Sequence, residues 1–577
     1  MLGNEAVARG LWEAGCRFVS SYPGTPSTEI TEEAALYEEI DAEWAPNEKV
    51  AMEAAWGAAV AGARSFCGQK HVGLNVAADP LFTASYTGVN GGLVIGVADD
   101  PGMHSSQNEQ DSRHYARAAK ILMLEPSDSA ACKGYAVLAF ELSEKFDTPV
   151  ILRTTTRIAH ARSPVETGER TPVPLKPYEK NPGKFLCLPA NAQKRHVFVE
   201  ERTKAQREWA ETSGINTVIP AGAESTVNGK AKIGVIAAGV CYQFAREALG
   251  DTASYLKLGC VWPLPDRMIT EFAASAEELW VAEDLDPYIE EHCKSLGLQV
   301  HGKDRLPMCG EYTQSVLRKA IRGEENESKS VDLAIPGRPP VLCPGCPHRG
   351  LFYILNKLKC FVSGDIGCYT LGALPPLTAM DTSVCMGASV SSLHGRNRVL
   401  PEGAGRSVAV IGDSTFLHSG VTGLMNIAYN QSNSVVVILD NSITGMTGHQ
   451  QNPGTGQTLK GNPAAAVSLE KLCEAVGIAD IRVVDPYDLQ ATEEALKSAL
   501  ATNAPAVVIS RRPCVLLKYV KKQAPLCVDT EKCVGCKMCM RIGCPAVSFA
   551  DGKAQIDATL CVGCGVCRRL CKPRAIG

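Results

Sequence analysis

The last part of the chain concentrates cysteines at short, regular intervals. Of the 24 cysteines, eight lie between Cys533 and Cys571. Six of them lie in two similar stretches, EKCVGCKMCM and TLCVGCGVCR, in which two residues separate each cysteine from the next, and a fourth cysteine follows each stretch. Three thiolates spaced in this way can hold one side of an iron–sulfur cubane, and the fourth ligand then comes from elsewhere. A zinc ribbon built from separated CxxC pairs is the alternative, but two four-cysteine runs favour iron–sulfur clusters.

The two runs resemble those of bacterial-type ferredoxins, in which each run supplies the fourth ligand of the other run's [4Fe–4S] cluster. The resemblance implies one cluster on Cys533, Cys536, Cys539 and Cys571. It implies a second cluster on Cys561, Cys564, Cys567 and Cys544. The first run has one extra residue before Cys544, which leaves open an atypical potential or the loss of one iron. The expected task of this segment is electron transfer.

A second group of residues could bind a metal ion and a diphosphate. Asp413 and Asn441 each follow a run of β-branched apolar residues, so both should lie at the carboxyl edge of a parallel sheet, where ligands of doubly wound folds bind. Gly412 would let the backbone approach a phosphate, and oxygen ligands suit Mg²⁺. On their own these could be ordinary turn residues. The expected strand, crossover helix and strand are Ser407–Ile411, Phe416–Gln431 and Val435–Leu439.

A third candidate is the carboxylate of Glu48 in the stretch WAPNEKVAMEAAWGAAVAGAR. Asn47 is a plausible helix cap, which places Glu48 in the first turn. A Glu there is commonly a solvated partner of the helix dipole.

Six stretches together resemble a known family. They are YPGTPSTEI, NEKVAMEAAWGAA, DDPGMHSSQNEQDSR, CPGCPHRG, GDIGCYTLG and LDNSITGMTGHQ. With the cysteine-rich segment they are similar to the alpha subunits of indolepyruvate ferredoxin oxidoreductases, which are thiamine-diphosphate-dependent 2-oxoacid:ferredoxin oxidoreductases. The resemblance extends over essentially the whole chain.

The resemblance implies roles for the residues above. Glu48 would activate the aminopyrimidine ring of thiamine diphosphate, and Thr25 would lie near cofactor and substrate. Mg²⁺ would be held by Asp413, Asn441 and the backbone carbonyl of Ile443. The remaining expected cofactor contacts are Gly412, Ser414, which replaces a commoner Gly, and Gly387.

The residue that would hold the substrate carboxylate is less evident. Pyruvate-acting relatives use an arginine, and none stands at the matching point, Ala98–Asp100. His104 or Arg113 could serve instead, although His104 could equally be a loop histidine satisfied locally.

Four further cysteines could hold a third cluster beside the thiamine, as in the wider superfamily. They are Cys343, Cys346, Cys368 and Cys514, although the interval from Cys346 to Cys368 is a little shorter than usual. Cysteines are also common as small buried apolar residues, which is the default for Cys360 and Cys385.

The implied reaction is the oxidative decarboxylation of indolepyruvate, phenylpyruvate or 4-hydroxyphenylpyruvate to the aryl-acetyl-CoA, with ferredoxin as electron acceptor. A smaller beta subunit is expected, as a heterodimer or two copies of each chain. Two alternatives stay open. One is an oxidoreductase of pyruvate or branched-chain oxoacids, and the other is a non-catalytic iron–sulfur carrier on a thiamine-type scaffold.

The rest of the sequence must position these groups. Its 577 residues exceed the roughly 250–300 of a single core. Alternating strand-like and helical segments predict an α/β fold with parallel sheets flanked by helices. A net charge of -4 gives no reason to expect nucleic acid. No secretory signal or membrane-spanning run is visible, so a cytoplasmic protein is expected.

Five segments are expected. They are a pyrimidine-binding domain at 1–165, a connection at 166–230, a transketolase C-terminal-like domain at 231–325, a diphosphate-binding domain at 335–520 and a ferredoxin-like domain at 524–577.

Overall fold

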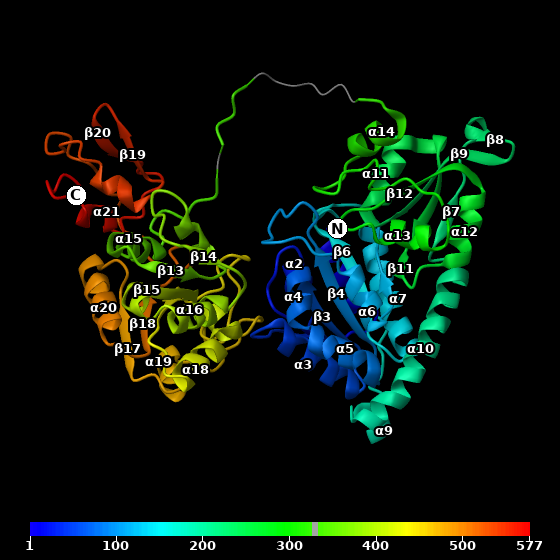
Figure 1. Ribbon diagram of the computed structural model, residues 1–577, viewed down its shortest axis with the longest axis horizontal. Helices are drawn as coiled ribbons and strands as arrows, with labels where there is room; N and C mark the ends of the chain where they lie inside the picture. The colour runs from blue at the N-terminus through cyan, green and yellow to red at the C-terminus, as the bar shows by residue number, and fades with distance from the viewer. Residues whose placement is uncertain (326–332, 338) are drawn as a thin grey trace. The chain divides into compact units, whose positions relative to one another are not determined.

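The computed structural model describes residues 1–325, 333–337 and 339–577. The chain divides into two compact units, Met1–Asp332 and Leu333–Gly577 (Figure 1). The boundary expected between the domains at 231–325 and 335–520 includes residues 326–332, which lie outside the described residues. In the part of the chain that is described, no helix is both long and apolar enough to cross a membrane.

The first unit contains a seven-stranded sheet in the order β11-β5-β6-β4-β3-β1-β2. All neighbouring strands are parallel except β11 and β5. The two apolar strands β4 and β6 are buried along their whole length. The strands are β1 (Phe18–Ser21), β2 (Asp41–Trp44), β3 (Ser65–Lys70), β4 (Leu93–Asp99), β5 (Met123–Leu124), β6 (Val150–Thr155) and β11 (Cys260–Trp262).

A second sheet of the same unit has the order β12-β9-β10-β7, and β8 pairs with β9. Its strand β9 leads directly into α11, which begins at Gly239. The strands are β7 (Thr217–Ile219), β8 (Thr226–Val227), β9 (Lys230–Ala238), β10 (Ser254–Leu258) and β12 (Ala276–Ala282).

Helices surround these sheets. They are α1 (Gly3–Glu13), α2 (Thr28–Ala34), α3 (Glu48–Val60), α4 (His71–Val76), α5 (Ala78–Thr87), α6 (Arg113–Ala119), α7 (Ser129–Phe146), α8 (Thr156–His160), α9 (Pro182–Phe185), α10 (Pro189–Thr212), α11 (Gly239–Leu249), α12 (Asp266–Ala274), α13 (Tyr288–Ser295) and α14 (Gln314–Arg322).

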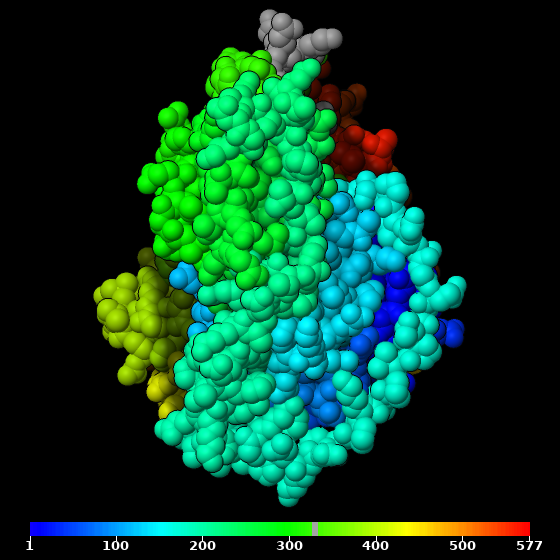
Figure 2. Space-filling model, turned by 90° about the vertical axis from the view of Figure 1, so that its right-hand side faces the viewer, coloured from blue at the N-terminus to red at the C-terminus, as the bar shows by residue number. Residues whose placement is uncertain are grey.

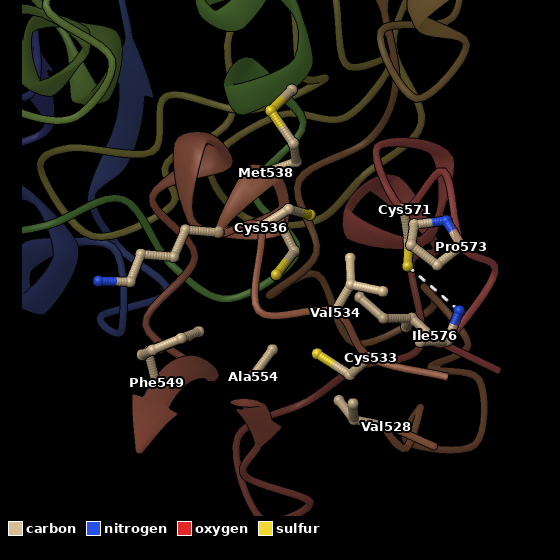
Figure 3. A pocket seen from close by; sticks show the side chains of 13 residues that line it. Val528, Cys533, Val534, Cys536, Met538, Phe549, Ala554, Cys571, Pro573 and Ile576 are labelled. Carbon is tan, nitrogen blue, oxygen red and sulfur yellow. Dashed lines mark hydrogen bonds between the residues drawn. The ribbon is translucent and has the colours of Figure 1, made fainter. Parts of the chain in front are cut away.

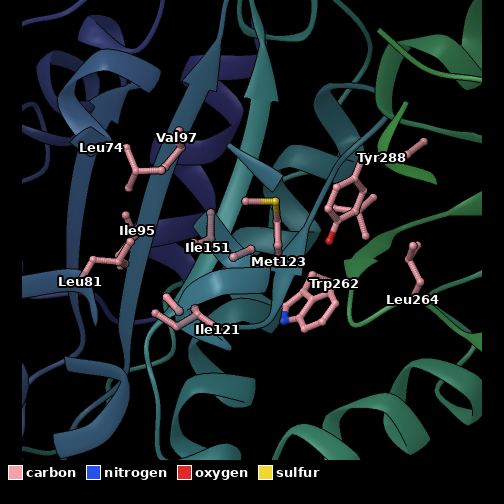
Figure 4. Packing of buried hydrophobic residues seen from close by; sticks show 14 of the residues in the cluster. Leu74, Leu81, Ile95, Val97, Ile121, Met123, Ile151, Trp262, Leu264 and Tyr288 are labelled. Atoms are coloured by element: carbon pink, nitrogen blue, oxygen red, sulfur yellow. The ribbon is translucent and has the colours of Figure 1, made fainter. Parts of the chain in front are cut away.

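One hydrophobic core joins the two sheets of the first unit. Ile95 and Ile151 of the larger sheet belong to the same buried cluster as Ile236 and Leu256 of the second sheet, and Figure 4 shows part of this cluster. The two α/β segments, at 1–165 and 231–325, therefore fold against each other as one body.

The segment expected to be a connection contains a long helix, α10, which the sequence analysis did not predict. It packs against α5 and α12. Figure 2 shows the surface of this part of the chain in contact with the neighbouring segments, without a gap between them. Its buried residues include Arg202 and Gln206, so its inner face lacks the apolar stripe by which a helix is recognised.

The second unit is built on a six-stranded sheet, β14-β13-β15-β16-β18-β17, in which every pair is parallel. The α/β class with parallel sheets is thus confirmed. The strands are β13 (Phe361–Gly364), β14 (Thr382–Ser383), β15 (Ser407–Gly412), β16 (Val435–Asp440), β17 (Asp480–Val484) and β18 (Ala506–Arg511), and the tail adds the antiparallel pair β19 (Val547–Ala550) and β20 (Lys553–Ile556).

Successive residues of these strands enter two different cores, as the pleat requires. Val408 and Val410 belong to a cluster that also contains Cys533 and Cys567 of the tail. Ala409 and Ile411 belong to the cluster on the other face. The helices are α15 (His348–Leu358), α16 (Ala388–Val399), α17 (Asp413–Thr415), α18 (Val421–Tyr429), α19 (Leu469–Ala475), α20 (Leu489–Ala501) and α21 (Val566–Arg569).

The crossover between β15 and β16 differs in detail from the expectation. Helical structure begins at Asp413, directly after the strand, and reaches α18 through a π turn at Phe416–Gly420. Single π turns inside helices often occur at functional sites.

Candidate active site

The carboxyl edge of the second unit's sheet carries the expected metal-binding residues. β15 and β16 are parallel and in register, with Gly412 opposite Leu439, so Asp413 and Asn441 emerge at the same edge. Asp413 and Asn441 are both buried. The Thr444 hydroxyl donates to Ser414 Oγ at 2.8 Å, which joins the loops that follow the two strands.

A cavity of about 450 Å³ opens at this edge, within the range of ligand pockets. Asp413, Asp440 and Ser442 line it, together with Arg511. Burial, followed by the negative charge of Asp440, raises the pKa of Asp413 to about 8. A buried carboxylate in this setting is stabilised in its charged form by a cation. The oxygen donors on this edge therefore fit a divalent metal ion such as Mg²⁺.

Gly387 lies where the chain enters α16, at φ +86°. A side chain there would collide with Ser419 Oγ, so glycine is required at this position. Its N–H donates to Asp365 Oδ1 at 3.0 Å, and the Ser389 N–H donates to Oδ2 of the same carboxylate at 3.0 Å. Asp365 therefore fixes the start of α16. Sequence reasoning missed this role, and its signal was an aspartate directly after a buried strand in GDIGCYTLG.

The four cysteines of the expected third cluster come together in the second unit. Burial, and then the charges of Cys514 and Cys343, raise the pKa of Cys368 to about 11. Cys346 lies in the same CPGC loop, and its N–H donates to the carbonyl of Cys343 at 3.0 Å. The Cys514 N–H donates to the Asn441 carbonyl at 2.9 Å. This cysteine group thus adjoins the loop expected to bind the metal.

The eight C-terminal cysteines line two separate cavities. Cys533, Cys536, Cys539 and Cys571 surround the first cavity, and Figure 3 shows the labelled cysteine side chains converging on one space. Cys544, Cys561, Cys564 and Cys567 surround the second. Each cavity therefore contains three cysteines of one run and one of the other, which is the grouping implied by the ferredoxin resemblance.

Backbone N–H groups point at several of these sulfur atoms. Ala575 donates to Cys571 Sγ at 3.2 Å (Figure 3). Leu526 and Gly563 donate to Cys561 Sγ at 3.4 and 3.5 Å. Hydrogen bonds to the sulfur ligands are among the features that tune iron–sulfur clusters. The donor set is therefore suited to iron–sulfur clusters.

The second cavity adjoins the third cysteine group. Pro344 and Gly345, which lie between Cys343 and Cys346, also line that cavity. The Arg349 side chain donates to the Cys343 carbonyl at 3.1 Å and to the Ile542 carbonyl at 3.2 Å. One guanidinium therefore ties the CPGC loop to the segment just before Cys544.

In the first unit, Glu48 opens α3 and is 5% exposed. The Val50 N–H donates to Asn47 Oδ1 at 2.9 Å, so Asn47 caps the helix as predicted. A Cβ built on Gly73 would lie 2.8 Å from Glu48 Oε1, which shows how closely α4 covers the carboxylate. Thr25 follows β1, the parallel neighbour of β2, so Thr25 and Glu48 lie at the same edge of their sheet.

The two residues considered for the substrate carboxylate have other partners. His104 is exposed, and its Nε2 lies 3.3 Å from Glu311. The Arg113 side chain is 2% exposed and forms ion pairs with Asp111 and Glu283. The Arg113 guanidinium is therefore committed to a buried charge network.

Two family models match the chain, one in each of its compact units. A family model described as the thiamine pyrophosphate enzyme C-terminal TPP-binding domain matches residues 365–510. Another, described as pyruvate flavodoxin/ferredoxin oxidoreductase, thiamine diphosphate-binding, matches residues 9–213. Among solved structures, a 2-oxoglutarate:ferredoxin oxidoreductase from Magnetococcus marinus aligns with a TM-score of 0.45 and 18% identity, over 56% of this chain and 64% of that one.

Curated relatives match most of the chain. Indolepyruvate oxidoreductase subunit IorA of Pyrococcus horikoshii is 40% identical over 96% of this chain and 93% of its own length. The subunit of the same name from Archaeoglobus fulgidus is 41% identical over 100% of this chain and 97% of its own. The family expected from the motifs is thereby confirmed, and the chain belongs to the indolepyruvate oxidoreductase subunits IorA, within the thiamine-diphosphate-dependent 2-oxoacid:ferredoxin oxidoreductases.

Proposed function

We propose that the chain catalyses the oxidative decarboxylation of aryl pyruvates. A 2-oxoacid and coenzyme A would give the acyl-CoA and CO₂, and the two electrons released would reduce two ferredoxins. The observation that carries the proposal is the contact between a candidate metal-binding loop and a cysteine group, through the 2.9 Å bond from Cys514 N to Asn441 O. An oxidative enzyme needs such an arrangement, because electrons must leave the reaction centre.

Residues of the second unit would hold the diphosphate end of the cofactor. Asp413, Asn441 and the Ile443 carbonyl would bind Mg²⁺, with Gly412 and Ser414 beside the phosphates. Gly387, anchored by Asp365, would form a neighbouring part of the wall. When bound, thiamine diphosphate supplies the nucleophilic carbon and the electron sink for decarboxylation.

Glu48 would bind and orient the aminopyrimidine ring. Its buried carboxylate can accept a hydrogen bond from a ring nitrogen and hold the proton exchanged there. Thr25, at the same edge, would contact cofactor or substrate. Gly73 contributes by leaving room for the carboxylate beneath α4.

The cysteines would hold three [4Fe–4S] clusters, which supply one-electron acceptors. The first tail cluster would use Cys533, Cys536, Cys539 and Cys571, and the second Cys544, Cys561, Cys564 and Cys567. The third would use Cys343, Cys346, Cys368 and Cys514. The cavities of the tail and the shared CPGC loop support this proposal, in which the segment at 524–577 would be a ferredoxin-like domain.

We base the proposed partners and substrates on the family to which the chain belongs. The relatives are named as subunits of an oxidoreductase, so a smaller beta subunit is expected beside this chain. Indolepyruvate, phenylpyruvate and 4-hydroxyphenylpyruvate are the proposed substrates, and a free ferredoxin is the proposed acceptor. A carrier without catalysis would have no need of Glu48, Asp413 and Asn441 together.

The test uses the anaerobically purified protein with its partner subunit, Mg²⁺ and thiamine diphosphate. Indolepyruvate, phenylpyruvate, pyruvate and 2-oxoglutarate are added separately while the visible iron–sulfur absorbance is recorded. We expect bleaching by the aryl pyruvates and none in Glu48→Gln. The control Glu53→Gln changes an exposed residue of the same helix that pairs with Lys49, and it should bleach normally.

The outcomes separate the alternatives. Bleaching mainly by pyruvate would keep the reaction and overturn the substrate. A protein with intact clusters and bound thiamine diphosphate that no oxoacid bleaches would be a carrier.

A further inference from the structure

Lys70 is a buried cation at the edge of the sheet that carries Glu48. It is the last residue of β3, pairs in register with Ala98 of β4, and is 8% exposed. Lysine is almost never this buried unless its charge has a partner. Burial lowers the pKa of Lys70, while the negative charges of Asp100 and Glu48 act in the opposite sense. The fold therefore keeps an ammonium group close to the candidate acid–base residue.

The surroundings of Lys70 use only part of its hydrogen-bonding capacity. Its Nζ donates to Ser105 O at 2.8 Å and to Ser106 Oγ at 2.9 Å. An ammonium group has three donors, so among the contacts of the described residues one N–H remains available. Asp100 accepts hydrogen bonds from Ser105, Ser106 and Thr156, and among the contacts of the described residues its carboxylate does not bond Lys70 directly.

The chain places Lys70 beside both expected active-site residues of the first unit. A Cβ built on Gly24 would lie 3.4 Å from Lys70 Cγ, so the lysine stem runs along the loop that contains Thr25. Gly73, three residues after Lys70, packs against the Glu48 carboxylate. Because α4 follows β3 directly, Lys70 and the residue that covers Glu48 lie within one turn of chain.

We propose that the Lys70 ammonium binds the carboxylate of the 2-oxoacid substrate. The inference rests on the proposed function and assigns one of its specificity-determining residues. A 2-oxoacid carries one negative charge next to its reacting carbonyl, so a cation near Glu48 would both attract the acid and orient that carbonyl. Arg113 is committed to Asp111 and Glu283, Arg153 to Asp99 and Glu125, and His104 is exposed and paired with Glu311. Among the described residues near Glu48, Lys70 is therefore a buried cation without a direct ion pair.

The test compares phenylpyruvate with its methyl ester, which lacks the negative charge and adds one methyl group. Binding is measured by calorimetry on the thiamine-loaded protein with its partner subunit, in a Glu48→Gln background that prevents turnover. Lys70→Met should weaken phenylpyruvate binding about 10- to 100-fold, the effect of losing a hydrogen bond to a charged group. Binding of the ester should change less than about threefold, since it offers no charge to the ammonium.

Further variants guard against a structural effect. Lys70→Arg should recover most of the phenylpyruvate affinity, and Lys49→Met, at an exposed lysine of α3, should leave both ligands unchanged. With Glu48 restored, Lys70→Met should raise KM for phenylpyruvate more than it lowers kcat. Equal weakening of acid and ester, or no recovery in Lys70→Arg, would overturn the proposal and assign Lys70 to the anchoring of the Ser105–Ser106 loop.

Failure of the proposed function gives a different result. If the protein with Lys70 intact binds none of the 2-oxoacids, the substrate class itself is wrong, and the role of Lys70 is overturned with it.

Discussion

Cys544 provides a sharp test of how the tail is organised. In sequence it belongs to the run Cys533–Cys544, but in space it lines the second cavity with Cys561, Cys564 and Cys567. Replacing it with alanine should therefore damage the cluster of the other run. Since one [4Fe–4S] cluster would be lost, the iron content should fall by about four atoms per chain.

Double variants test this grouping quantitatively through the iron content. Cys544→Ala combined with Cys564→Ala removes two ligands of one cavity, so the loss should stay near four irons, as expected when two sites share one cluster. Cys544→Ala combined with Cys536→Ala affects both cavities, and the loss should approach about eight irons. Colorimetric iron analysis and electron paramagnetic resonance of the reduced protein measure both effects.

The control is Cys527→Ala, which changes an exposed cysteine of the same segment and should leave the iron content unchanged. If each run instead holds its own cluster, the two double variants will exchange their results. That outcome would refute the assignment of the cavities to clusters.

Three other predictions follow from single side chains. Asp413→Asn should abolish Mg²⁺-dependent retention of thiamine diphosphate, measured as cofactor content after gel filtration, because a hard anionic ligand is lost. Arg153→Met should destabilise the first unit by about 3–5 kcal/mol, because it leaves Asp99 and Glu125 buried without their partner. Tryptophan fluorescence in urea measures the unfolding of this unit alone, since all six Trp precede residue 333. The hydrogen bond from Arg511 lowers the pKa of Glu470 to about 2, so its stabilising contribution is present above the ordinary Glu pKa and is lost as the pH falls through 4 towards 2. Arg511→Met should remove this acid dependence, as followed by circular dichroism.

Local patterns predicted the parts of the fold that one element can specify. The β-branched runs at β15 and β16 are buried on both faces, so their sequences are almost wholly apolar, as expected for central parallel strands. The start of α3 was evident because Asn47 is a strong capping residue. The two predicted strands also placed Asp413 and Asn441 at one edge, because the carboxyl ends of neighbouring parallel strands lie at the same edge of a sheet.

What the sequence could not show depends on contacts between distant segments. α10 was missed because its inner face buries Arg202, whose guanidinium donates to Ser85 O and Ser85 Oγ, both at 2.9 Å; a helix that buries charge has no apolar stripe to read. β11 belongs to the segment at 231–325 but pairs with β5 in the sheet of the segment at 1–165. The local pattern of apolar residues cannot indicate such a pairing.

The overlooked candidate residues share this cause. Lys70 looks like any surface lysine in sequence, and its burial is decided by the loops around Gly24 and Ser105. Asp365 follows a strand, as many turn residues do, and its role appears only when α16 comes back to it. Both are polar groups whose partners are far away along the chain, so their significance depends on the tertiary fold.

Arg349 is another polar residue whose partners are distant along the chain, and its contacts would bear on electron transfer. It is buried, and its guanidinium bonds backbone carbonyls on both sides, at Leu342 and Cys343 and at Ile542 and Gly543. Burial lowers its pKa, while the charges of Cys544, Cys346, Cys343 and Cys564 act in the opposite sense. A planar fork with five donors can hold two loops in one geometry in a way that a lysine cannot. Because a single side chain of α15 fixes both loops, the spacing between the second and third cysteine groups is set inside the second unit. The proposed electron path from the Asn441 loop to the tail would therefore not depend on how the two units are arranged.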